Sequence, residues 1–405
     1  MTSDAGPFQG IRVLDLSSVV MGPYATQLLA DYGADVITIE AAGGDTNRRM
    51  GGGPHPELTG VALNLLRNKR NLAIDIKAPA GRQIVLDLAR TSDVFVSNLR
   101  PGPLARLGLT YEEIVAVRPD IVYATAAGFA SDSDRRDDPA YDDVIQAETG
   151  LVDLLHRVTG MPQLIPSLVA DKVSGLTLAF AISAALLERA QTGRGRRIKV
   201  AMTEAVRSFV LVEHGGAAMS EPAAGPVGYQ RVLTPARQAQ RSADGWICIF
   251  PYHRRHHEAL AAEAKLLGID VDAIPRPRDD PSGLYQLVGA VAPRRTNAEW
   301  LAWCRERGIP AAAVATLEDL VDGLDLAEHP VAGPYRVAPR PARFEGLDEA
   351  PPRPAPLIGQ DTVDVLAELG YGPERIARLQ AGGVLQTPGL GAAALPADPA
   401  AGTVP

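Results

Sequence analysis

Cysteine is scarce in this chain of 405 residues. Only Cys248 and Cys304 occur, and two cysteines so far apart form neither a disulfide framework nor a metal-binding spacing. The histidine cluster at 253–257 has two arginines between its imidazoles, and no carboxylate or cysteine completes a ligand set. We therefore expect no metal site, and the cysteine usage fits a reducing, cytoplasmic compartment.

An excess of positive charge and a long hydrophobic run are also missing. The formal net charge is -8, which argues against non-specific binding to nucleic acid. The longest apolar run, 176–187, is too short to span a bilayer and is interrupted by Thr177 and Ser183, so it predicts a buried helix and no membrane partner. The first residues carry no basic region and no apolar core, so we expect no signal peptide.

The glycine fingerprint of dinucleotide-binding proteins is the third absence. Residues 11–16 and 35–40 read as strands and 25–32 as a helix, which together predict a βαβ unit. The alternative is a dinucleotide-binding half with Glu40 on a ribose. That alternative is disfavoured because Gly22 stands alone between Met21 and Pro23, and the G-x-G-x-x-G pattern is absent.

Strands alternating with helices continue through residue 125, which predicts an α/β fold with a Rossmann-like parallel sheet. A length of 405 residues and a shift in composition near residue 220 indicate a second, smaller α+β domain. The expected parts are a large α/β domain (1–212), a linker (213–225), the small domain (226–335), a proline-rich return linker (336–356), a C-terminal helical part of the large domain (357–387) and a disordered tail (388–405).

Asp171 stands where the apolar helix at 176–189 should begin. A carboxylate there meets free backbone N–H groups and the positive end of the helix dipole, so we expect its charged form to be favoured. Such an aspartate is either a plain N-cap or a nucleophile ready to react, and the residue taken alone favours the cap.

Several collinear motifs decide between these readings. The sequence resembles the family III CoA-transferases, a group that includes formyl-CoA transferase, carnitine CoA-transferase and, as relatives, the α-methylacyl-CoA racemases. The resemblance covers about 8–386. Its motifs are GIRVLDL at 10–16, GP at 22–23, LADYGADVITIE at 29–40, NKRNL at 68–72, NLRPG at 98–102, YDDVIQA at 141–147, VADKVSG at 169–175, TGRG at 192–195 and LIGQ at 357–360.

The resemblance implies that Asp171 is the catalytic nucleophile. It would attack an acyl-CoA thioester to give a mixed anhydride, and the released thiolate would then form an aspartyl-CoA thioester. A carboxylic acid acceptor would repeat the cycle in reverse. The resemblance also implies an interlocked homodimer, in which the connections at 213–225 and 336–356 would cross. Coenzyme A, carried as acyl-CoA, is the only cofactor expected.

The coenzyme A contacts carried over by the resemblance come from five segments. The resemblance implies backbone contacts near Val20 and Met21 and the adenine side at 74–77. It also implies phosphate partners at Lys77 and Arg106, and the pantetheine arm near the last segment. These residues are Val20, Met21, Ile74, Asp75, Ile76, Lys77, Asn98, Leu99, Arg100, Arg106, Asp138, Pro139, Ala140 and Tyr141.

The chain departs from the family pattern at several positions. Ala41 stands where some members have an arginine and Pro139 where some have a lysine, so Arg48 or Arg49 is a candidate substitute. No glycine-rich loop is evident between 215 and 260, which argues against formyl or oxalate chemistry and favours a bulkier acyl group.

Two other functions stay open at this stage. The racemase relatives pair the aspartate with a histidine, and that histidine falls on Tyr141, which is a poor base at neutral pH. Racemisation by exchange of an α-proton is therefore the runner-up. A non-catalytic acyl-CoA-binding paralogue is the third reading, and the presence of Asp171 speaks against it. The donor and acceptor acids are not named by the sequence.

Overall fold

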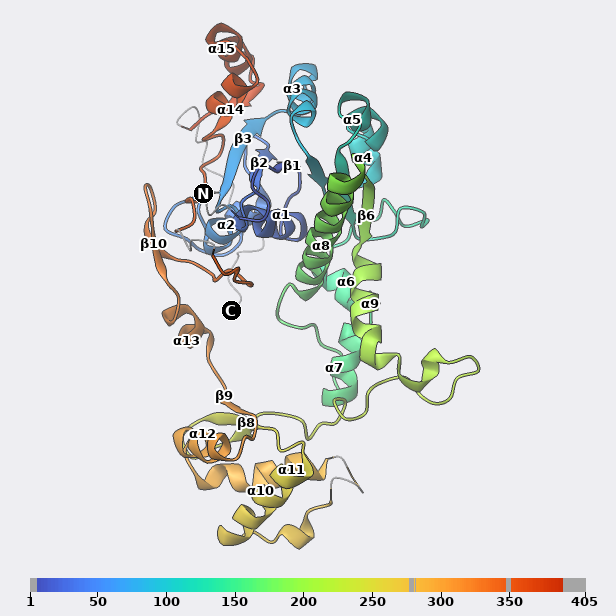
Figure 1. Cartoon of the computed structure of the whole chain (residues 1–405), viewed down its shortest axis with the longest axis vertical. Helices are drawn as coiled ribbons and strands as arrows, with labels where there is room; N and C mark the ends of the chain where they lie inside the picture. The colour runs from blue at the N-terminus through green and yellow to red at the C-terminus, as the bar shows by residue number, and fades with distance from the viewer. Residues whose placement is uncertain (1–5, 277–279, 281, 347–350, 389–405) are drawn as a thin grey trace. The chain divides into compact units, whose positions relative to one another are not determined.

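The computed structural model describes residues 6–276, 280, 282–346 and 351–388 (Figure 1). Their contacts group the chain into two compact units. The first contains residues up to Thr149, 166–209 and the chain from Leu324, and the second contains 150–165 and 210–323. Most of the tail expected to be disordered, 389–405, lies outside the described residues. The domain and linker boundaries expected from the sequence stay a prediction.

A seven-stranded sheet forms the centre of the first unit. Six strands run parallel, and the edge strand β12 pairs antiparallel with β3. This confirms the expected α/β class with a parallel-dominated sheet. In spatial order the strands are β12 (Leu385–Gln386), β3 (Lys69–Ile74), β2 (Asp35–Glu40), β1 (Arg12–Asp15), β4 (Val94–Ser97), β5 (Val122–Ala127) and β6 (Arg197–Ala201).

Helices surround this sheet. The helices of the first unit are α1 (Met21–Asp31), α2 (Gly60–Leu65), α3 (Pro79–Arg90), α4 (Pro101–Arg106), α5 (Tyr111–Val117), α6 (Asp142–Glu148), α8 (Val169–Thr192), α14 (Thr362–Glu368) and α15 (Pro373–Ala381). A 3₁₀ helix, η1 (Thr46–Arg49), follows β2, and a two-stranded ribbon consists of β10 (Leu326–His329) and β11 (Gly333–Arg336). Helix α9 (Met202–His214) begins in the first unit and ends in the second.

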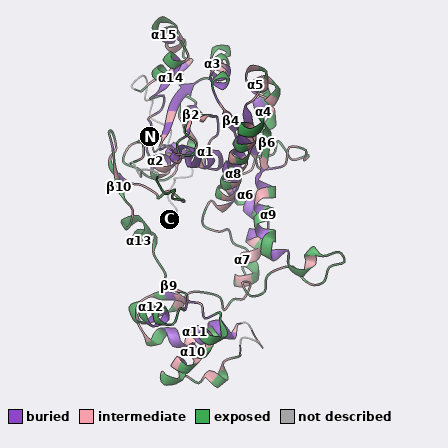
Figure 2. Cartoon of the chain, viewed as in Figure 1, coloured by how far each residue is buried: buried purple, intermediate pink, exposed green. Residues whose placement is uncertain are grey.

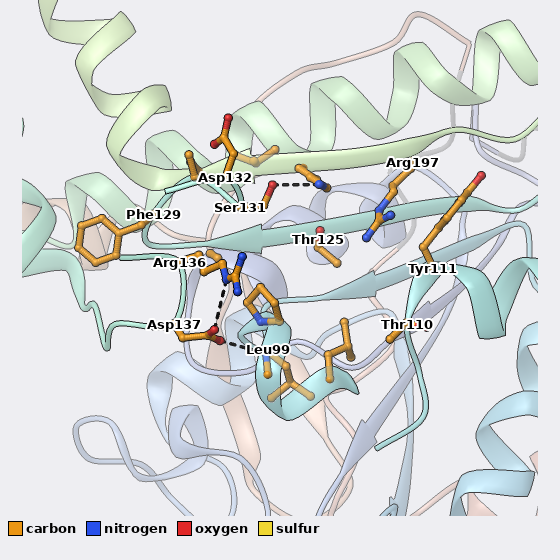
Figure 3. Close-up of a pocket in the computed structure, with 18 of the residues that line it drawn as sticks. Leu99, Thr110, Tyr111, Thr125, Phe129, Ser131, Asp132, Arg136, Asp137 and Arg197 are labelled. Atoms are coloured by element: carbon orange, nitrogen blue, oxygen red, sulfur yellow. Dashed lines mark hydrogen bonds and ion pairs between the residues drawn. The ribbon is translucent and has the colours of Figure 1, made fainter. Parts of the chain in front are cut away.

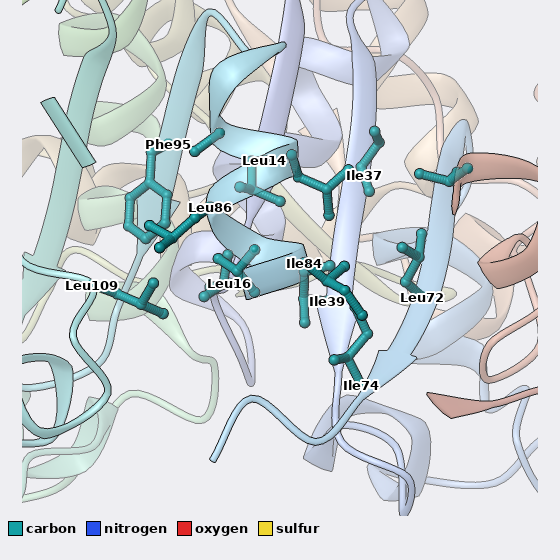
Figure 4. Close-up of a cluster of buried hydrophobic side chains, with 14 of the residues drawn as sticks. Leu14, Leu16, Ile37, Ile39, Leu72, Ile74, Ile84, Leu86, Phe95 and Leu109 are labelled. Carbon is teal, nitrogen blue, oxygen red and sulfur yellow. The ribbon is translucent and has the colours of Figure 1, made fainter. Parts of the chain in front are cut away.

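The main core lies between the sheet and α3. Leu14, Ile37 and Leu72 come from neighbouring strands and are fully buried against Ile84 of α3 (Figure 4). Such apolar strands are typical of a parallel sheet covered on both faces. The connections β1–α1–β2 and β3–α3–β4 cross the sheet in opposite directions, so right-handed crossovers place α1 and α3 on opposite faces.

Helix α8 packs along α1. The contact is close at Gly175, where an added Cβ would lie 2.7 Å from the carbonyl oxygen of Met21. By length and composition alone α8 is apolar enough to cross a membrane, although core helices pass the same test. Residues such as Leu178 and Ile182 are fully buried inside the unit. The predicted buried helix is therefore confirmed along one face, and the opposite face is exposed at Leu176, Phe180 and Leu187.

Strand β3 corrects a sequence prediction. The apolar residues at 72, 74 and 76 predict a strand at 72–77, but the strand begins at Lys69 and ends at Ile74. Lys69 and Arg70 precede the predicted strand, yet each has a partner in the fold. Lys69 is fully buried and its ammonium group donates to the Pro23 carbonyl at 2.9 Å. Asp75, Ile76 and Lys77 instead follow the strand in a turn, where the Lys77 N–H donates to Asp75 Oδ1 at 3.0 Å.

The second unit combines helices with a three-stranded antiparallel sheet. Its strands are β7 (Gln240–Arg241), β8 (Trp246–Ile249) and β9 (Ala311–Ala313), and its helices are α7 (Leu151–Thr159), α10 (Arg254–Leu266), α11 (Gly283–Val291), α12 (Asn297–Glu306) and α13 (Leu317–Asp322). Trp300 is fully buried at its centre, and its indole N–H donates to the Ala292 carbonyl at 3.0 Å.

Candidate active site

The sheet changes winding direction between β1 and β4. The chain leaves β1 toward β2 and leaves β4 toward β5, so the two loops diverge at the carboxyl ends of these strands. Such a point is where open α/β sheets bind ligands. Asn98, directly after β4, joins the two loops. Its Oδ1 accepts the Ser18 N–H at 2.9 Å, and its amide group donates to the Ser18 carbonyl at 2.7 Å.

A cavity of about 290 Å³ opens at this place. It brings Asp171 together with nine of the residues expected at a coenzyme A site, namely Val20, Met21, Asn98, Leu99, Arg100, Asp138, Pro139, Ala140 and Tyr141. The other lining residues are Ser18, Val19, Pro103, Ala127, Gly128 and Met202. Segments far apart in the sequence therefore meet around one carboxylate.

Five expected contact residues are not among those that line this cavity. Ile74 is buried in the main core, whereas Asp75 and Lys77 are exposed in the turn after β3. Ile76 is half-buried there, and Arg106 is exposed at the end of α4. Their proposed contacts with the nucleotide stay predictions.

Asp171 is the third residue of α8 and not its N-cap. The N-cap is Leu168, which has no side chain able to accept a hydrogen bond. The backbone N–H of Asp171 is instead satisfied by Oδ1 of Asp142, at 2.9 Å. The plain capping role that the sequence favoured for Asp171 taken alone is therefore wrong.

The expected ionisation of Asp171 is also wrong in direction. Burial raises the pKa of Asp171 to about 7 from an ordinary 3.8, and the negative charges of Asp142 and Asp143 add to this effect, while Lys172 opposes it. The positive end of the helix dipole favours the carboxylate, but its typical contribution is smaller than the cost of moving a charge out of water. Asp171 is thus an aspartate that titrates near neutral pH.

Asp142 was missed by the sequence reasoning. It is the first residue of α6, only 4% exposed, and its second oxygen accepts from the Gln146 amide at 2.6 Å. The signal was present, since Asp142 directly follows Tyr141 within the YDDVIQA motif. Its contact with residue 171 depends on tertiary folding, which the spacing along the chain does not reveal.

The family model described as CoA-transferase family III matches residues 8–362. The chain belongs to CoA-transferase family III. It is 31% identical to an acyl-CoA transferase of Fusarium pseudograminearum over 95% of this chain and 89% of that protein. It is 29% identical to the succinyl-CoA:glutarate CoA-transferase of Mus musculus, over 94% of this chain and 90% of the relative.

Solved structures agree with this membership. A CAIB/BAIF family protein from Brucella suis superposes with a TM-score of 0.76 at 25% identity, covering 90% of this chain and 100% of the other. As a family III CoA-transferase, the protein is an enzyme that acts on CoA thioesters and carboxylates. The resemblance seen in the sequence motifs is thereby confirmed.

Arg48 was one candidate substitute for the arginine that some members have where this chain has Ala41. Its guanidinium is fully buried and binds Glu40 at 2.7 and 2.9 Å, and it also donates to the Pro356 carbonyl at 3.0 Å. A guanidinium buried and held in this way does not reach a phosphate at the surface. Arg49 is half-buried and reaches only the Gly43 carbonyl, at 3.3 Å, so it stays the candidate for this family III position.

Within the described ranges, no group of three or more histidine, cysteine, aspartate or glutamate side chains is placed to hold a metal ion. The lining of the Asp171 cavity also contains no histidine. Tyr141, on which the resemblance places the histidine of the racemase relatives, lines this cavity and is 70% exposed.

A larger cavity of about 680 Å³ adjoins the first and shares Leu99 and Ala127 with it (Figure 3). Asp137 lines the larger cavity. Its side chain accepts the Gly102 N–H at 3.0 Å, and its carbonyl accepts from the Arg100 guanidinium at 2.6 Å. The basic residues in this cavity already have partners. The Lys199 ammonium group, for example, donates to the Ser131 hydroxyl at 2.9 Å.

Proposed function

We propose that Asp171 carries the transferred groups in covalent form during CoA transfer from an acyl-CoA donor to a carboxylic acid acceptor. The observation that supports this most strongly is its half-buried carboxylate in the cavity at the carboxyl end of the sheet. A pKa of about 7 makes this oxygen more basic than an ordinary aspartate, and a more basic oxygen is generally a better nucleophile. A substantial fraction is nevertheless ionised at neutral pH.

The proposed reaction needs four acyl transfers and no net proton transfer. The Asp171 carboxylate attacks the thioester carbonyl, the C–S bond breaks, and a mixed anhydride and CoA thiolate form. The thiolate attacks the aspartyl carbonyl of the anhydride and releases the donor acid as a carboxylate. The acceptor carboxylate then attacks the aspartyl-CoA thioester, and the thiolate released attacks the acceptor acyl carbon to regenerate Asp171.

The start of α1 is the proposed oxyanion site for these steps. Val20 is the N-cap of α1 and has no capping side chain, and Met21 is the first helical residue. The first N–H groups of a helix have no partner within it. Because Val20 and Met21 line the same cavity as Asp171, their backbone N–H groups are suited to stabilise the negative oxygen of each tetrahedral intermediate.

The remaining lining residues are proposed to hold coenzyme A. They are Asn98, Leu99 and Arg100 after β4 and the segment from Asp138 to Tyr141 before α6. We assign the pantetheine arm to the space between them. The nucleotide would extend toward Lys77 and Arg106. The acids exchanged are open, and dicarboxylic acids such as glutarate belong in the first substrate panel because of the mouse relative's name.

Intact mass spectrometry tests this proposal. The protein is mixed with an acyl-CoA and trapped with hydroxylamine, which converts an activated aspartyl group into a stable hydroxamate. We expect the adduct at Asp171, and we expect the Asp171→Ala variant to bind CoA without adduct or transfer. Deuterium entering the α-carbon from solvent without any adduct would instead establish the racemase reaction. CoA binding with neither outcome would establish a non-catalytic paralogue.

We also propose that the enzyme is a cytoplasmic homodimer. Cys248 and Cys304 are both free thiols, as a reducing compartment favours. Leu176, Phe180 and Leu187 form an exposed apolar face of α8. Figure 2 colours the chain by burial, with exposed residues in green. Phe180 is 74% exposed, and a contiguous face of this kind favours burial by a partner. Light scattering after gel filtration should give the dimer mass, and Phe180→Glu should shift the equilibrium toward monomer.

A further inference from the structure

The backbone of Val19 has an unusual conformation. Its φ angle is +67°, in the left-handed region that β-branched residues avoid. The only other non-glycine residue with positive φ in the described chain is Asn68, a residue type that tolerates this region. Val19 lies between β1 and α1 and lines the Asp171 cavity. Strain of this kind persists only where surrounding contacts hold it, and it concentrates at functional sites.

Side chains from two other loops hold this conformation. Asn98 fixes both the N–H and the carbonyl of Ser18, at 2.9 and 2.7 Å. Asp45, which lies after β2, accepts the N–H of Val19 on Oδ1 at 3.0 Å. The two peptide groups that flank Ser18 are therefore held from both sides of β1.

Asp45 is itself anchored to the end of β2. Its Oδ1 also accepts the Asn47 N–H at 2.9 Å and thereby caps η1. Its own N–H donates to Glu40 at 3.0 Å. Glu40 is bound in turn by the buried Arg48 and by the amide group of Asn71, at 2.8 Å. The position of Asp45 is thus set by the sheet and not by solvent.

We propose that Asp45 is a positioning residue for the CoA-transfer reaction. By holding Val19 in the left-handed conformation, Asp45 fixes the entry of the chain into α1. It thereby aims the first N–H groups of that helix at the reacting carbonyl beside Asp171. This inference rests on the proposed function. Asp45 acts through Val19, and it is not among the residues that line the cavity.

Three variants test the role. Asp45→Ala removes the acceptor for Val19 but leaves the N–H groups of α1 in place, so we expect kcat to fall about 10- to 100-fold, at or below the roughly 100- to 1,000-fold loss on deleting an oxyanion donor, with KM for acyl-CoA changed less than about 3-fold. Asp45→Asn keeps an oxygen acceptor and should retain kcat within about 3-fold. Val19→Gly in the Asp45→Ala background should restore kcat at least about 5-fold, because glycine adopts positive φ without that hydrogen bond.

Asp270→Ala is the matched control. Asp270 caps the 3₁₀ helix η3 (Val271–Ala273) by accepting the Asp272 N–H at 3.1 Å, in the same way as Asp45 caps η1, but it lies in the second unit and outside the cavity. Its kcat should equal that of wild type. If Asp45→Asn loses as much kcat as Asp45→Ala, or if Val19→Gly restores nothing, the positioning role is refuted.

Adduct formation separates this inference from the proposed function. If wild-type protein forms the Asp171 adduct and Asp45→Ala keeps full kcat, the inference about Asp45 is refuted and the proposed function is not. Wild-type protein that forms no adduct refutes the covalent mechanism on which it rests. Folding of Asp45→Ala is checked by its urea midpoint, and if it does not fold, Asp45→Asn is compared with the Val19→Gly single variant. If Asp45→Asn then loses as much kcat as was expected for Asp45→Ala, the positioning role is refuted.

Discussion

The backbone N–H of Asp171 donates a hydrogen bond of 2.9 Å to a carboxylate oxygen of Asp142. One acid therefore supports the start of α8 while its charge opposes ionisation of the other. Burial is the largest cause of the raised pKa of Asp171, and Asp142 is the next. The same contact that positions the proposed nucleophile thus also tunes it.

The pH dependence of activity should show this tuning. Because the proposed nucleophile is the carboxylate, kcat/KM should rise with pH through about 7 and level off above it. Asp142→Asn keeps an acceptor for the Asp171 N–H but removes the charge. We expect its acid limb to move down by about 1 pH unit, since burial still holds the pKa of Asp171 above its usual range.

Asp143→Asn is the matched control for that profile. Asp143 is exposed and ranks after Asp142 among the causes that raise the pKa of Asp171. Its removal should move the limb less than Asp142→Asn does. An unmoved acid limb in both variants would mean that another group controls the profile.

Stability should depend on pH through the same aspartate. Between about pH 4 and 7 the folded state keeps the Asp171 proton that the unfolded state has lost, so stability falls as pH rises in this window. Asp171→Asn removes the penalty. At pH 8 we expect the free energy of unfolding of Asp171→Asn to exceed that of wild type by about 1–2 kcal/mol, after allowance for the partial exposure of the side chain. This difference should shrink as the pH falls toward 4. Urea midpoints at both pH values measure it, and a gain independent of pH would contradict the assignment.

The strand pattern and the motif positions could be read from the sequence because they depend on local periodicity. The apolar runs at Leu14 and Ile37 predicted parallel strands, and the two loops that meet at Asn98 follow from the order of those strands. The grouping of Val20 and Tyr141 with Asp171 came from the family resemblance.

The errors concern groups whose state depends on partners distant in sequence. The ionisation of Asp171 was judged from its helix position, but burial and Asp142 decide it. Lys69 lies before the strand predicted at 72–77, yet it belongs to that strand and is buried next to Asp15 at 3.4 Å. Arg48 was a candidate substitute at the position of Ala41, yet Glu40 binds it in the interior. Charge in a sequence shows what must be paired or solvated, and only the fold shows which.

Close packing of α8 on α1 should make Gly175 sensitive to substitution. Gly175→Ala places a methyl group 2.7 Å from the Met21 carbonyl oxygen and 3.1 Å from the Tyr24 ring, so the helices must separate. We expect a loss of about 1–3 kcal/mol in unfolding free energy and a fall in activity, because Met21 lines the cavity. Gly60→Ala is the control, since its nearest neighbour would be at 3.9 Å. Equal stability of both variants in urea would contradict the close contact.

The buried pair of Arg48 and Glu40 should behave as a unit. Arg48→Met leaves the Glu40 carboxylate uncompensated in the interior, which typically costs about 3–5 kcal/mol of unfolding free energy. Adding Glu40→Gln removes that charge, so the double variant should be more stable than Arg48→Met alone, as measured by urea unfolding. Arg49→Ala is the control for stability, which it should leave unchanged. If Arg48→Met folded with wild-type stability, the pair would not hold the loop after β2, and the anchor of Asp45 would need another source.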